Sequence, residues 1–405
     1  MSKERTKFQR YRNVVTLGLV SLFTDISTEM VLSLYPIYLI KYLGSSKAVL
    51  GLIDGLSEAV AYATRPLSGA VSDKLGRRKA LATMGYLISS LAKPLLAFSR
   101  SWPEVLAVRL SDRLGKGLRT PPRDALLSQS VRGRDVGKAF GLHRTLDQLG
   151  AIIGPLLAMG LLSGLGIRGV FLTSLLPGLL AVILLTSLVS EEGAEGRAGG
   201  EGQVRGAWWR GLSVVLAPLL PLYLASYSFS FVLVRASELG IPFGLIPLVY
   251  AILNLSHALI GLPVGALMDK AGGRAALSLG YAAFMGASAL AALGPREHLT
   301  ALAIAALYGF YVGVFDTVPR ALISLHAPLA GRGRAYGLYY LAVGGASLVG
   351  NSVFGYLWST MGSLAAFTYS ISLSAVSFIL SITFRPACTR GSRPWRSHSP
   401  TQAPP

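Results

Sequence analysis

Long runs of apolar residues fill most of the chain, and short polar or Gly/Pro-containing segments separate them. A helix that crosses a bilayer needs about 20 mostly apolar residues, and twelve runs reach that length. They cover residues 12–42, 49–71, 80–98, 104–127, 138–163, 167–190, 212–237, 243–268, 275–293, 298–325, 335–360 and 363–384. The pattern therefore predicts an all-α membrane protein with twelve transmembrane helices.

The positive charge of the chain is concentrated in particular loops. Hydrophobic residues make up 52% of the sequence and charged residues only 14%, yet the formal net charge is +19. Most Lys and Arg residues outside the runs fall in the two tails and in alternate loops, which a twelve-span arrangement places on one side. Because cytoplasmic loops carry an excess of Lys and Arg, we expect a multi-pass plasma-membrane protein with both termini in the cytoplasm. This distribution explains the net charge without a nucleic-acid partner.

The twelve runs divide into two sets of six. Residues 190–211 are mostly polar and rich in glycine, which is typical of a flexible linker. We expect them to join an N-terminal half, residues 1–189, to a C-terminal half, residues 212–384. The proline-containing tail, residues 385–405, is predicted to be disordered. It holds Cys388, and a single cysteine excludes a disulfide framework.

The two halves are related in sequence. Gly69-Ala-Val-Ser-Asp-Lys-Leu-Gly-Arg-Arg follows the second run, and a similar segment that starts at Gly265, 196 residues later, follows the eighth. Residues 119–123 and 316–320 are similar to each other at nearly the same offset. A duplicated set of six helices implies a pseudo-two-fold axis along the membrane normal, with a central site between the halves.

These motifs resemble those of the major facilitator superfamily of secondary transporters, over essentially the whole chain. The most specific motif is the loop after the second helix, with Gly69, Asp73, Lys74, Gly76, Arg77 and Arg78, and a weaker copy has Gly265, Asp269, Lys270, Gly272 and Arg274. The resemblance implies a monomeric transporter, not an enzyme, that has no cofactor and moves a small-molecule substrate by alternating access.

The resemblance also implies a cytoplasmic gate. The gate residues would be Gly69, Asp73, Gly76, Arg77, Arg78, Asp124, Asp269 and Arg274. Asp124, at the cytoplasmic end of the fourth helix, would be a further partner of the loop that follows the second helix. In physical terms, we expect Asp73 to cap a helix N-terminus and to pair with Arg77, and Gly76 to supply the turn. Ordinary cytoplasmic positive charge is the alternative explanation.

Two further motifs bear on transport. Arg113 matches the arginine of the family's fourth helix, and Gly150, Gly154 and Pro155 resemble the fifth-helix motif of the family's antiporters, without the glycine pair that ends it. Glycines four residues apart permit close helix contact, and the proline adds a kink. The motif indicates either a helix that seals an antiporter against leakage or small-residue packing alone.

Ionisable residues inside the runs are costly in a membrane and are functional hypotheses by default. Asp25 with Glu29, and Asp54 with Glu58, are four residues apart and lie on one face of their helices. Bases of the fourth run can neutralise most of these acids, and a surplus acid can carry a proton. The candidates for proton coupling are Asp25, as the first choice, Glu29, Asp54 and Asp147, with Arg113 as a modulator. A purely structural ion-pair network is the alternative.

Other charged residues of the runs are candidates for substrate contact. They are Glu58, Arg109, Lys116, Arg119, Arg123, Asp316 and Arg320. Aromatic residues of the first, seventh, eighth and tenth runs can contact an amphipathic substrate, although most are expected to be packing residues. His257 is isolated from other ionisable residues along the sequence.

We therefore expect a proton-coupled antiporter that exports a small molecule, with protons and the lipid bilayer as its other partners. An uptake symporter, an organic-anion exchanger, a metal-cation exporter that uses Asp25, Glu29, Asp54 and Glu58, and a non-transporting membrane scaffold or sensor stay open as alternatives. The sequence contains no Cys/His set for a bound metal and no phosphate-binding loop.

Overall fold

The computed structural model describes residues 2–131, 136–191, 208–326 and 332–383, and every regular element in these ranges is helical. The elements are α1 (Ser2–Leu32), α2 (Tyr35–Ile37), η1 (Tyr38–Tyr42), α3 (Lys47–Leu75), α4 (Arg78–Ala92), η2 (Lys93–Phe98), α5 (Trp102–Gln129), α6 (Val136–Thr173), α7 (Leu175–Leu188), α8 (Trp208–Ala225), α9 (Phe229–Glu238), η4 (Phe243–Leu245), α10 (Ile246–Leu293), α11 (His298–His326), α12 (Arg332–Met361) and α13 (Ser363–Thr383). The predicted all-α fold is confirmed. The tail and most of the predicted linker lie outside the described residues.

Two of the helices each contain more than one predicted span. The chain turns at Gly166 inside α6 and at Gly272 inside α10, where φ is +64° and +86°. Both values lie in the left-handed region that glycine adopts without a steric penalty. Each glycine therefore marks the turn between two consecutive membrane spans, which α6 and α10 each join under one label.

Seven helical stretches of the described residues are long and apolar enough to cross a membrane. The helices α3, α5 and α12 are outside this group. In α3 and α5 the reason is charge, since both contain several acids and bases within their spans. Charged side chains do not face lipid without a large cost, and these helices instead direct them toward the centre of the protein.

The first helix of each half is interrupted, which the sequence did not predict. α1 ends at Leu32 before α2 begins at Tyr35, and α8 ends at Ala225 before α9 begins at Phe229. At the second break, a Cβ on Gly350 of α12 would lie 2.5 Å from the carbonyl oxygen of Tyr223. Only a glycine permits this close approach of α12 to the end of α8. Both breaks lie beside the cavity described below.

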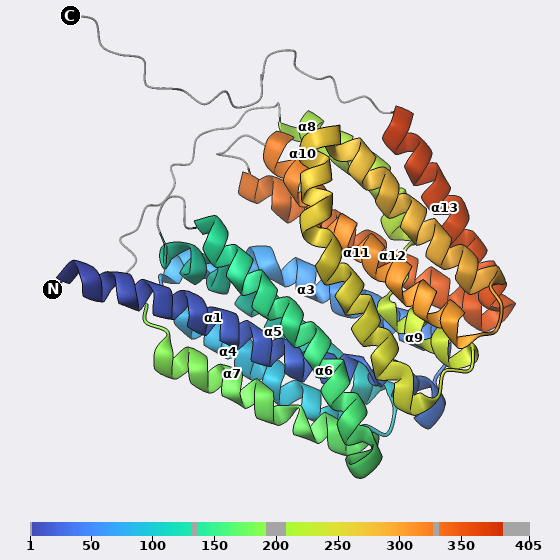
Figure 1. Ribbon diagram of the computed structural model, residues 1–405, viewed down its shortest axis with the longest axis horizontal. Coiled ribbons are helices and arrows are strands. Elements are labelled where there is room, and N and C mark those ends of the chain that lie inside the picture. Colours follow the sequence, from blue (N-terminus) through green and yellow to red (C-terminus); the bar gives the residue numbers. More distant parts are fainter. Residues whose placement is uncertain (1, 132–135, 192–207, 327–331, 384–405) are drawn as a thin grey trace, which may run out of the picture.

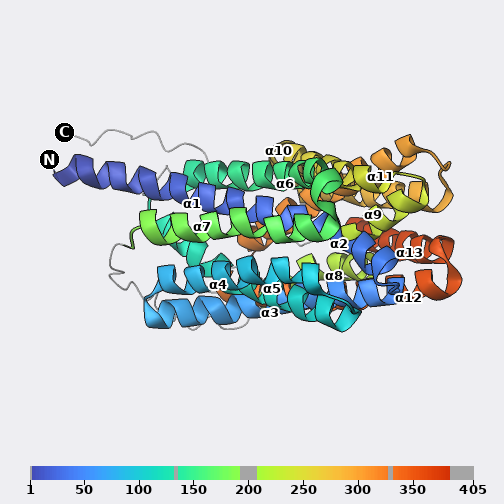
Figure 2. The same cartoon turned by 90° about the horizontal axis from the view of Figure 1, so that it is seen from below.

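The N-terminal half, α1 to α7, meets the C-terminal half, α8 to α13, mainly where α3 packs against α12, α6 against α10 and η4, and α2 against α9. We name the end of the molecule at which α1 begins and α13 ends the terminal end, and the opposite end the far end. The helices of the two halves converge toward the far end and diverge toward the terminal end (Figure 1). Within the N-terminal half, α1, α4, α5, α6 and α7 run alongside one another (Figure 2).

Contacts between the halves close the far end. Lys47 Nζ of α3 lies 3.0 Å from a carboxylate oxygen of Glu238 of α9. A Cβ on Gly51 of α3 would overlap the carbonyl oxygen of Asn351 of α12, and one on Gly55 would lie 2.9 Å from the carbonyl oxygen of Leu348. The backbones of α3 and α12 therefore touch near the far end.

Candidate functional site

A cavity of about 310 Å³ lies between the two halves. The N-terminal half lines it mainly with charged side chains, which are Glu29, Asp54, Glu58, Arg109, Arg113 and Lys116, together with Tyr62. The C-terminal half lines it mainly with aromatic side chains, which are Tyr223, Tyr227, Phe229, Tyr250, Tyr308, Tyr311, Phe315, Tyr339 and Tyr340, together with Asp316 and Arg320. One wall of the cavity is thus largely ionic and the other largely aromatic.

Asp54 is the most fully bonded acid of the ionic wall. It is 2% exposed and accepts hydrogen bonds from the Tyr35 hydroxyl and, at 2.5 Å, from the Ser228 hydroxyl. Arg109 Nη2 lies 3.5 Å from the same carboxylate. Ser228 stands in the break between α8 and α9, so the break supplies a hydrogen bond across the two halves. These donors leave no oxygen of Asp54 without a partner.

Two bases of α5, Arg109 and Arg113, pair with acids of the network. Arg109 Nη1 lies 3.6 Å from Asp112, which also accepts a 2.5 Å hydrogen bond from the Ser89 hydroxyl. Arg113 Nη1 lies 3.5 Å from Glu58. Two groups of the ionic wall lack such a pairing. The Lys116 side chain forms no hydrogen bond or ion pair among the described residues, and Glu29 Oε2 is buried without a hydrogen-bond partner.

A second ionic group joins the halves between α6 and α11. Arg144 Nη1 lies 3.4 Å from Asp147 of its own helix, and Arg144 Nη2 lies 3.2 Å from Asp316 of α11. Asp316 also pairs with Arg320 at 2.8 Å and with His257 of α10 at 3.3 Å. His257, isolated along the sequence, is therefore in contact with two charged residues in the fold.

Asp25 does not line the cavity. It faces Asp147 between α1 and α6, with the two carboxyl groups within hydrogen-bonding range of each other. Asp147 also accepts a 2.6 Å hydrogen bond from the Ser21 hydroxyl. Two carboxylates in contact repel each other unless a proton or a base intervenes. The pair Asp25 and Asp147 therefore stands apart from the cavity acids Glu29, Asp54 and Glu58.

Arg119 and Arg123, two of the predicted substrate contacts, lie away from the cavity lining. The Arg119 guanidinium packs 4.8 Å from the ring centre of Tyr86. Arg123 Nη2 pairs with Asp124 at 2.8 Å. The other predicted contacts, Glu58, Arg109, Lys116, Asp316 and Arg320, all line the cavity.

The predicted gate residues lie at the terminal end, with one difference in pairing. Gly76 ends α3 with φ +63°, which confirms the expected turn. Asp73 pairs with Arg78 at 3.3 Å and not with Arg77. It also lies in the last turn of α3, so it caps no helix N-terminus. That position is filled by Glu191, whose carboxylate accepts a 2.6 Å hydrogen bond from the backbone N–H of Arg78.

The other gate candidates have different surroundings. Asp124 pairs with its neighbour Arg123. Gly69 lies 3.7 Å from Pro121, measured from the position of a Cβ. Asp269 is exposed, and Arg274 follows the turn at Gly272. The expected latch between Asp124 and the loop is therefore not formed in this arrangement.

The glycines of the antiporter-type motif bring α6 against α1. A Cβ on Gly150 would overlap the carbonyl oxygen of Leu22, and one on Gly154 would lie 2.8 Å from the carbonyl oxygen of Ile26. Pro155 follows inside the helix. This close contact is the one the spacing predicts, and it holds Asp147 of α6 near Asp25 of α1.

Sequence reasoning missed an aromatic contact between the halves. Tyr62 of α3 stacks on Tyr340 of α12 with ring centres 5.4 Å apart and an angle of 12° between the rings. The Arg65 guanidinium lies 4.7 Å and 5.1 Å from these two ring centres. Helical spacing could have indicated Tyr62, because it follows Glu58 by four residues and lies on the same face of α3.

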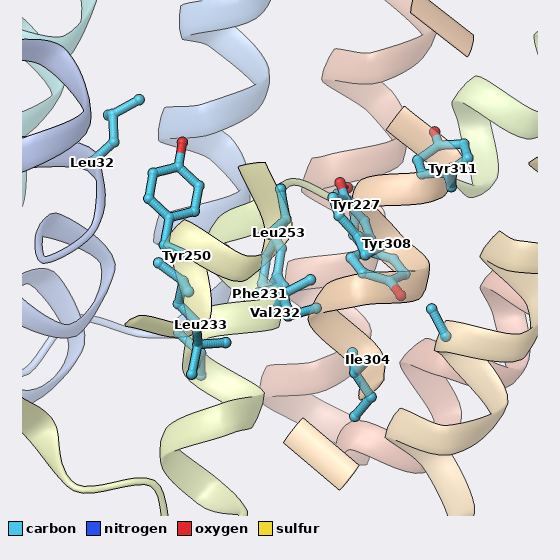
Figure 3. Close-up of a cluster of buried hydrophobic side chains, with 14 of the residues drawn as sticks. Leu32, Tyr227, Phe231, Val232, Leu233, Tyr250, Leu253, Ile304, Tyr308 and Tyr311 are labelled. Atoms are coloured by element: carbon cyan, nitrogen blue, oxygen red, sulfur yellow. The ribbon is translucent and has the colours of Figure 1, made fainter. Parts of the chain in front are cut away.

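Tyrosines of the C-terminal half form the opposite wall. Tyr227 and Tyr308 lie side by side with ring centres 5.4 Å apart, and Tyr308 and Tyr311 are separated by 5.4 Å (Figure 3). Tyr223 and Tyr339 share a 3.0 Å hydrogen bond between their hydroxyls. This wall offers both ring faces and hydroxyl groups to a bound molecule.

The acids named for the metal-cation alternative are dispersed. Asp54 and Glu58 are paired with Arg109 and Arg113, and Asp25 lies outside the cavity. In the ranges that the structure covers, no group of three or more His, Cys, Asp and Glu residues is placed to hold a metal ion.

Comparison with known proteins agrees with this architecture. The model of the Major Facilitator Superfamily matches the chain twice, over residues 17–234 and 213–403. An uncharacterised MFS-type transporter of Methanocaldococcus jannaschii is 30% identical over 386 residues, which cover 91% of this chain and 94% of that protein. The multidrug resistance protein MdtH of Aeromonas hydrophila is 31% identical over 147 residues, or 36% of this chain and 37% of that protein.

Solved structures share the fold at low sequence identity. The nucleoside transporter NupG superposes with a TM-score of 0.74 at 16% identity, over 92% of this chain and 98% of that one. A bacterial homologue of the human lysosomal transporter Spinster, in an inward-facing and unoccupied conformation, gives 0.71 at 17% identity over 93% and 98%. The chain belongs to the major facilitator superfamily and is a multi-pass membrane transporter, not an enzyme.

Proposed function

We propose that this transporter exchanges a small solute for protons and exports the solute by alternating access. The observation that carries the proposal is the central cavity, which both halves line and which the contacts of α3 with α9 and α12 close at the far end. A closed far end and diverging helices at the terminal end are what one state of an alternating-access cycle requires.

The positive charges of the loops support an orientation for this state. Among the described residues, the basic loop after α3 and the basic turn within α10 lie at the terminal end, which the charge rule assigns to the cytoplasm. In this orientation the cavity faces inward. The gate residue Asp73 is 73% exposed in this state. In the opposite state the loop around Gly76 and the end of α5 would meet the C-terminal half.

The pair Asp25 and Asp147 is our choice for the exchanged proton. Asp54 is already bonded to Tyr35, Ser228 and Arg109, so other donors occupy its carboxylate oxygens. Two facing carboxyl groups, in contrast, are relieved of their repulsion when one of them is protonated. Glu29 remains a second candidate, because one of its oxygens is buried without a partner beside the cavity.

The positive charge of Arg113, on α5, can influence the protonation of the candidate acids Asp25, Asp147 and Glu29. It binds Glu58 and lies 4.0 Å from Asp112. A guanidinium that stays charged holds its acid partners ionised, which leaves the proton to the acids that lack such a partner. The role of modulator proposed for Arg113 is consistent with this position.

The two walls of the cavity indicate the kind of solute. An aromatic or apolar group would stack on the tyrosines, and polar groups would meet Glu58, Arg109, Lys116, Asp316 and Arg320. A volume of about 310 Å³ suits a compact molecule. Organic-anion exchange is a second candidate, favoured by Lys116, which lines the cavity and whose side chain forms no direct ion pair among the described residues.

Thermal unfolding of the purified protein with matched probes tests the cavity assignment. The probes are phenylalanine, phenethylamine and 3-phenylpropionate, with alanine as the ringless control. A bound ligand raises the apparent Tm, and we expect a rise with at least one aromatic probe and a smaller one with alanine. No rise with any aromatic probe would contradict the assignment. A rise with 3-phenylpropionate alone that Lys116→Met removes and Lys270→Met retains would favour organic-anion exchange.

A further inference from the structure

Arg144 joins two acids that belong to different halves of the transporter. It extends from α6 to Asp147 on one side and to Asp316 of α11 on the other, at 3.4 Å and 3.2 Å. We propose that Arg144 is the positioning residue that transmits the protonation state of the Asp25 and Asp147 pair to the central cavity. The inference rests on the proton coupling proposed above and adds the residue that connects the proton to the substrate.

The contacts form one continuous path. Asp25 faces Asp147, Asp147 binds Arg144, and Arg144 binds Asp316. Asp316 lines the central cavity and holds Arg320, another lining residue, at 2.8 Å. Every step is a direct side-chain contact, so no long-range effect is needed to connect the proton pair, which lies outside the cavity, to the cavity wall.

Arg144 has room to move between its two partners. Its side chain is 48% exposed and borders a second cavity of about 570 Å³ between α6, α10 and α11. His257 lines both cavities and lies 3.2 Å from Arg144. A half-exposed guanidinium shared by two carboxylates can shift toward either of them at low cost, which is what a relay residue needs.

The direction of the effect follows from charge. When Asp25 and Asp147 are both ionised, they attract Arg144 strongly and weaken its hold on Asp316. When the pair takes up a proton from water, that attraction falls and Arg144 binds Asp316 more firmly. The tie to Asp316 exists in the arrangement open at the terminal end, so protonation stabilises this arrangement and deprotonation releases it.

Other ionisable groups also face the pair and must be separated from it. They are Glu29 of α1, Tyr86 of α4, Lys93 of η2, Lys116 and Arg123 of α5, and His143 of α6. The arginine side chain supplies a steady positive field. His143 precedes Arg144 in the sequence, and His257 lies 3.2 Å from its guanidinium. A test of the relay must therefore include both histidines.

Distance measurements between spin labels test the relay without a known substrate. Cys388→Ser removes the native thiol, and Gln129→Cys of α5 with Lys270→Cys of α10 places one label on each half at the terminal end. Between about pH 8 and pH 5, the range that includes histidine titration, we expect acid to increase the population with widely separated labels. Arg144→Gln should abolish this shift, and Arg144→Lys should retain part of it.

Two further variants make the result specific. Arg168→Gln removes an exposed charge from the same helix and should keep the full shift. Asp316→Asn leaves Arg144 in place but removes its partner across the halves, and it should lose the shift as Arg144→Gln does. If Arg144→Gln fails to fold, the relay is tested with Asp316→Asn, which should lose the shift, and with Arg144→Lys, which should retain part of it.

The possible outcomes separate the relay from the proton coupling on which it rests. A wild-type protein with no pH-dependent shift would contradict the proposed coupling itself. A normal wild-type shift that persists in Arg144→Gln would overturn the relay alone. Loss of the shift in His143→Gln or His257→Gln, with Arg144→Gln unaffected, would assign the response to a histidine and also overturn it.

Discussion

Lys47 and Glu238 form a 3.0 Å ion pair that joins α3 to α9 across the two halves at the far end. Their side chains are 26% and 33% exposed, so the pair contributes at most about 1 kcal/mol to far-end closure. We expect Glu238→Gln to shift the balance between open and closed far ends by no more than about fivefold. Spin labels at Arg100→Cys and Leu364→Cys measure this balance in the Cys388→Ser background.

The control for this pair is Glu297→Gln, which removes an exposed acid in the loop before α11. It should leave the label distances unchanged. Glu238 also pairs with Arg235 of its own helix at 3.2 Å, so Lys47→Gln, which leaves that pair in place, is measured beside it. A loss of far-end closure much larger than fivefold in both variants would show that the ion pair of Lys47 with Glu238 holds the halves together and that the backbone contacts of α3 with α12 contribute little.

Gly51 provides a steric test of the same closure. A methyl group there would overlap the Asn351 carbonyl oxygen, so Gly51→Ala should force α3 and α12 apart and depopulate the arrangement closed at the far end. Alanine favours helix over glycine by about 1 kcal/mol, so a weakened α3 would not explain the effect. The same far-end labels report it. Gly345→Ala, where a Cβ meets open space, is the matched control, and equal behaviour of the two variants would contradict the close contact.

Asp25→Asn should separate exchange from proton-driven transport. An amide cannot release the proton, so the variant should lose accumulation driven by a pH gradient but retain exchange of labelled for unlabelled substrate. Reconstituted vesicles with the aromatic probe that raises the Tm most measure both activities. Glu297→Gln serves as the control, and full gradient-driven accumulation in Asp25→Asn would remove this residue from the coupling site.

The fold was largely predictable because its main determinants are local. Runs of apolar residues give the spans, and the repeated Gly69 and Gly265 segments give the two halves. The break between α8 and α9 was not predictable, since residues 212–237 read as one uninterrupted apolar run. It is accompanied by the close approach of Gly350, more than a hundred residues away in sequence.

The sequence indicated most of the charged residues that line the cavity, but it indicated few of the pairs that they form. Helical spacing placed Glu58 and Arg113 near the centre, where they pair. The partner of Arg144 on α11 and the cap that Glu191 gives to α4 depend on how distant segments meet. No spacing rule within one helix reveals such contacts, because they are set by packing between helices.

Proton movement in inside-out vesicles tests the central claim most directly. The lumen is first acidified, and the aromatic probe that raises the Tm most is added outside, on the side of the terminal end. The account predicts that the lumen becomes more alkaline as the probe enters in wild type, and that it does not in Asp25→Asn. Entry of the probe at equal rates in both proteins, with no change of luminal pH, would contradict proton-coupled exchange.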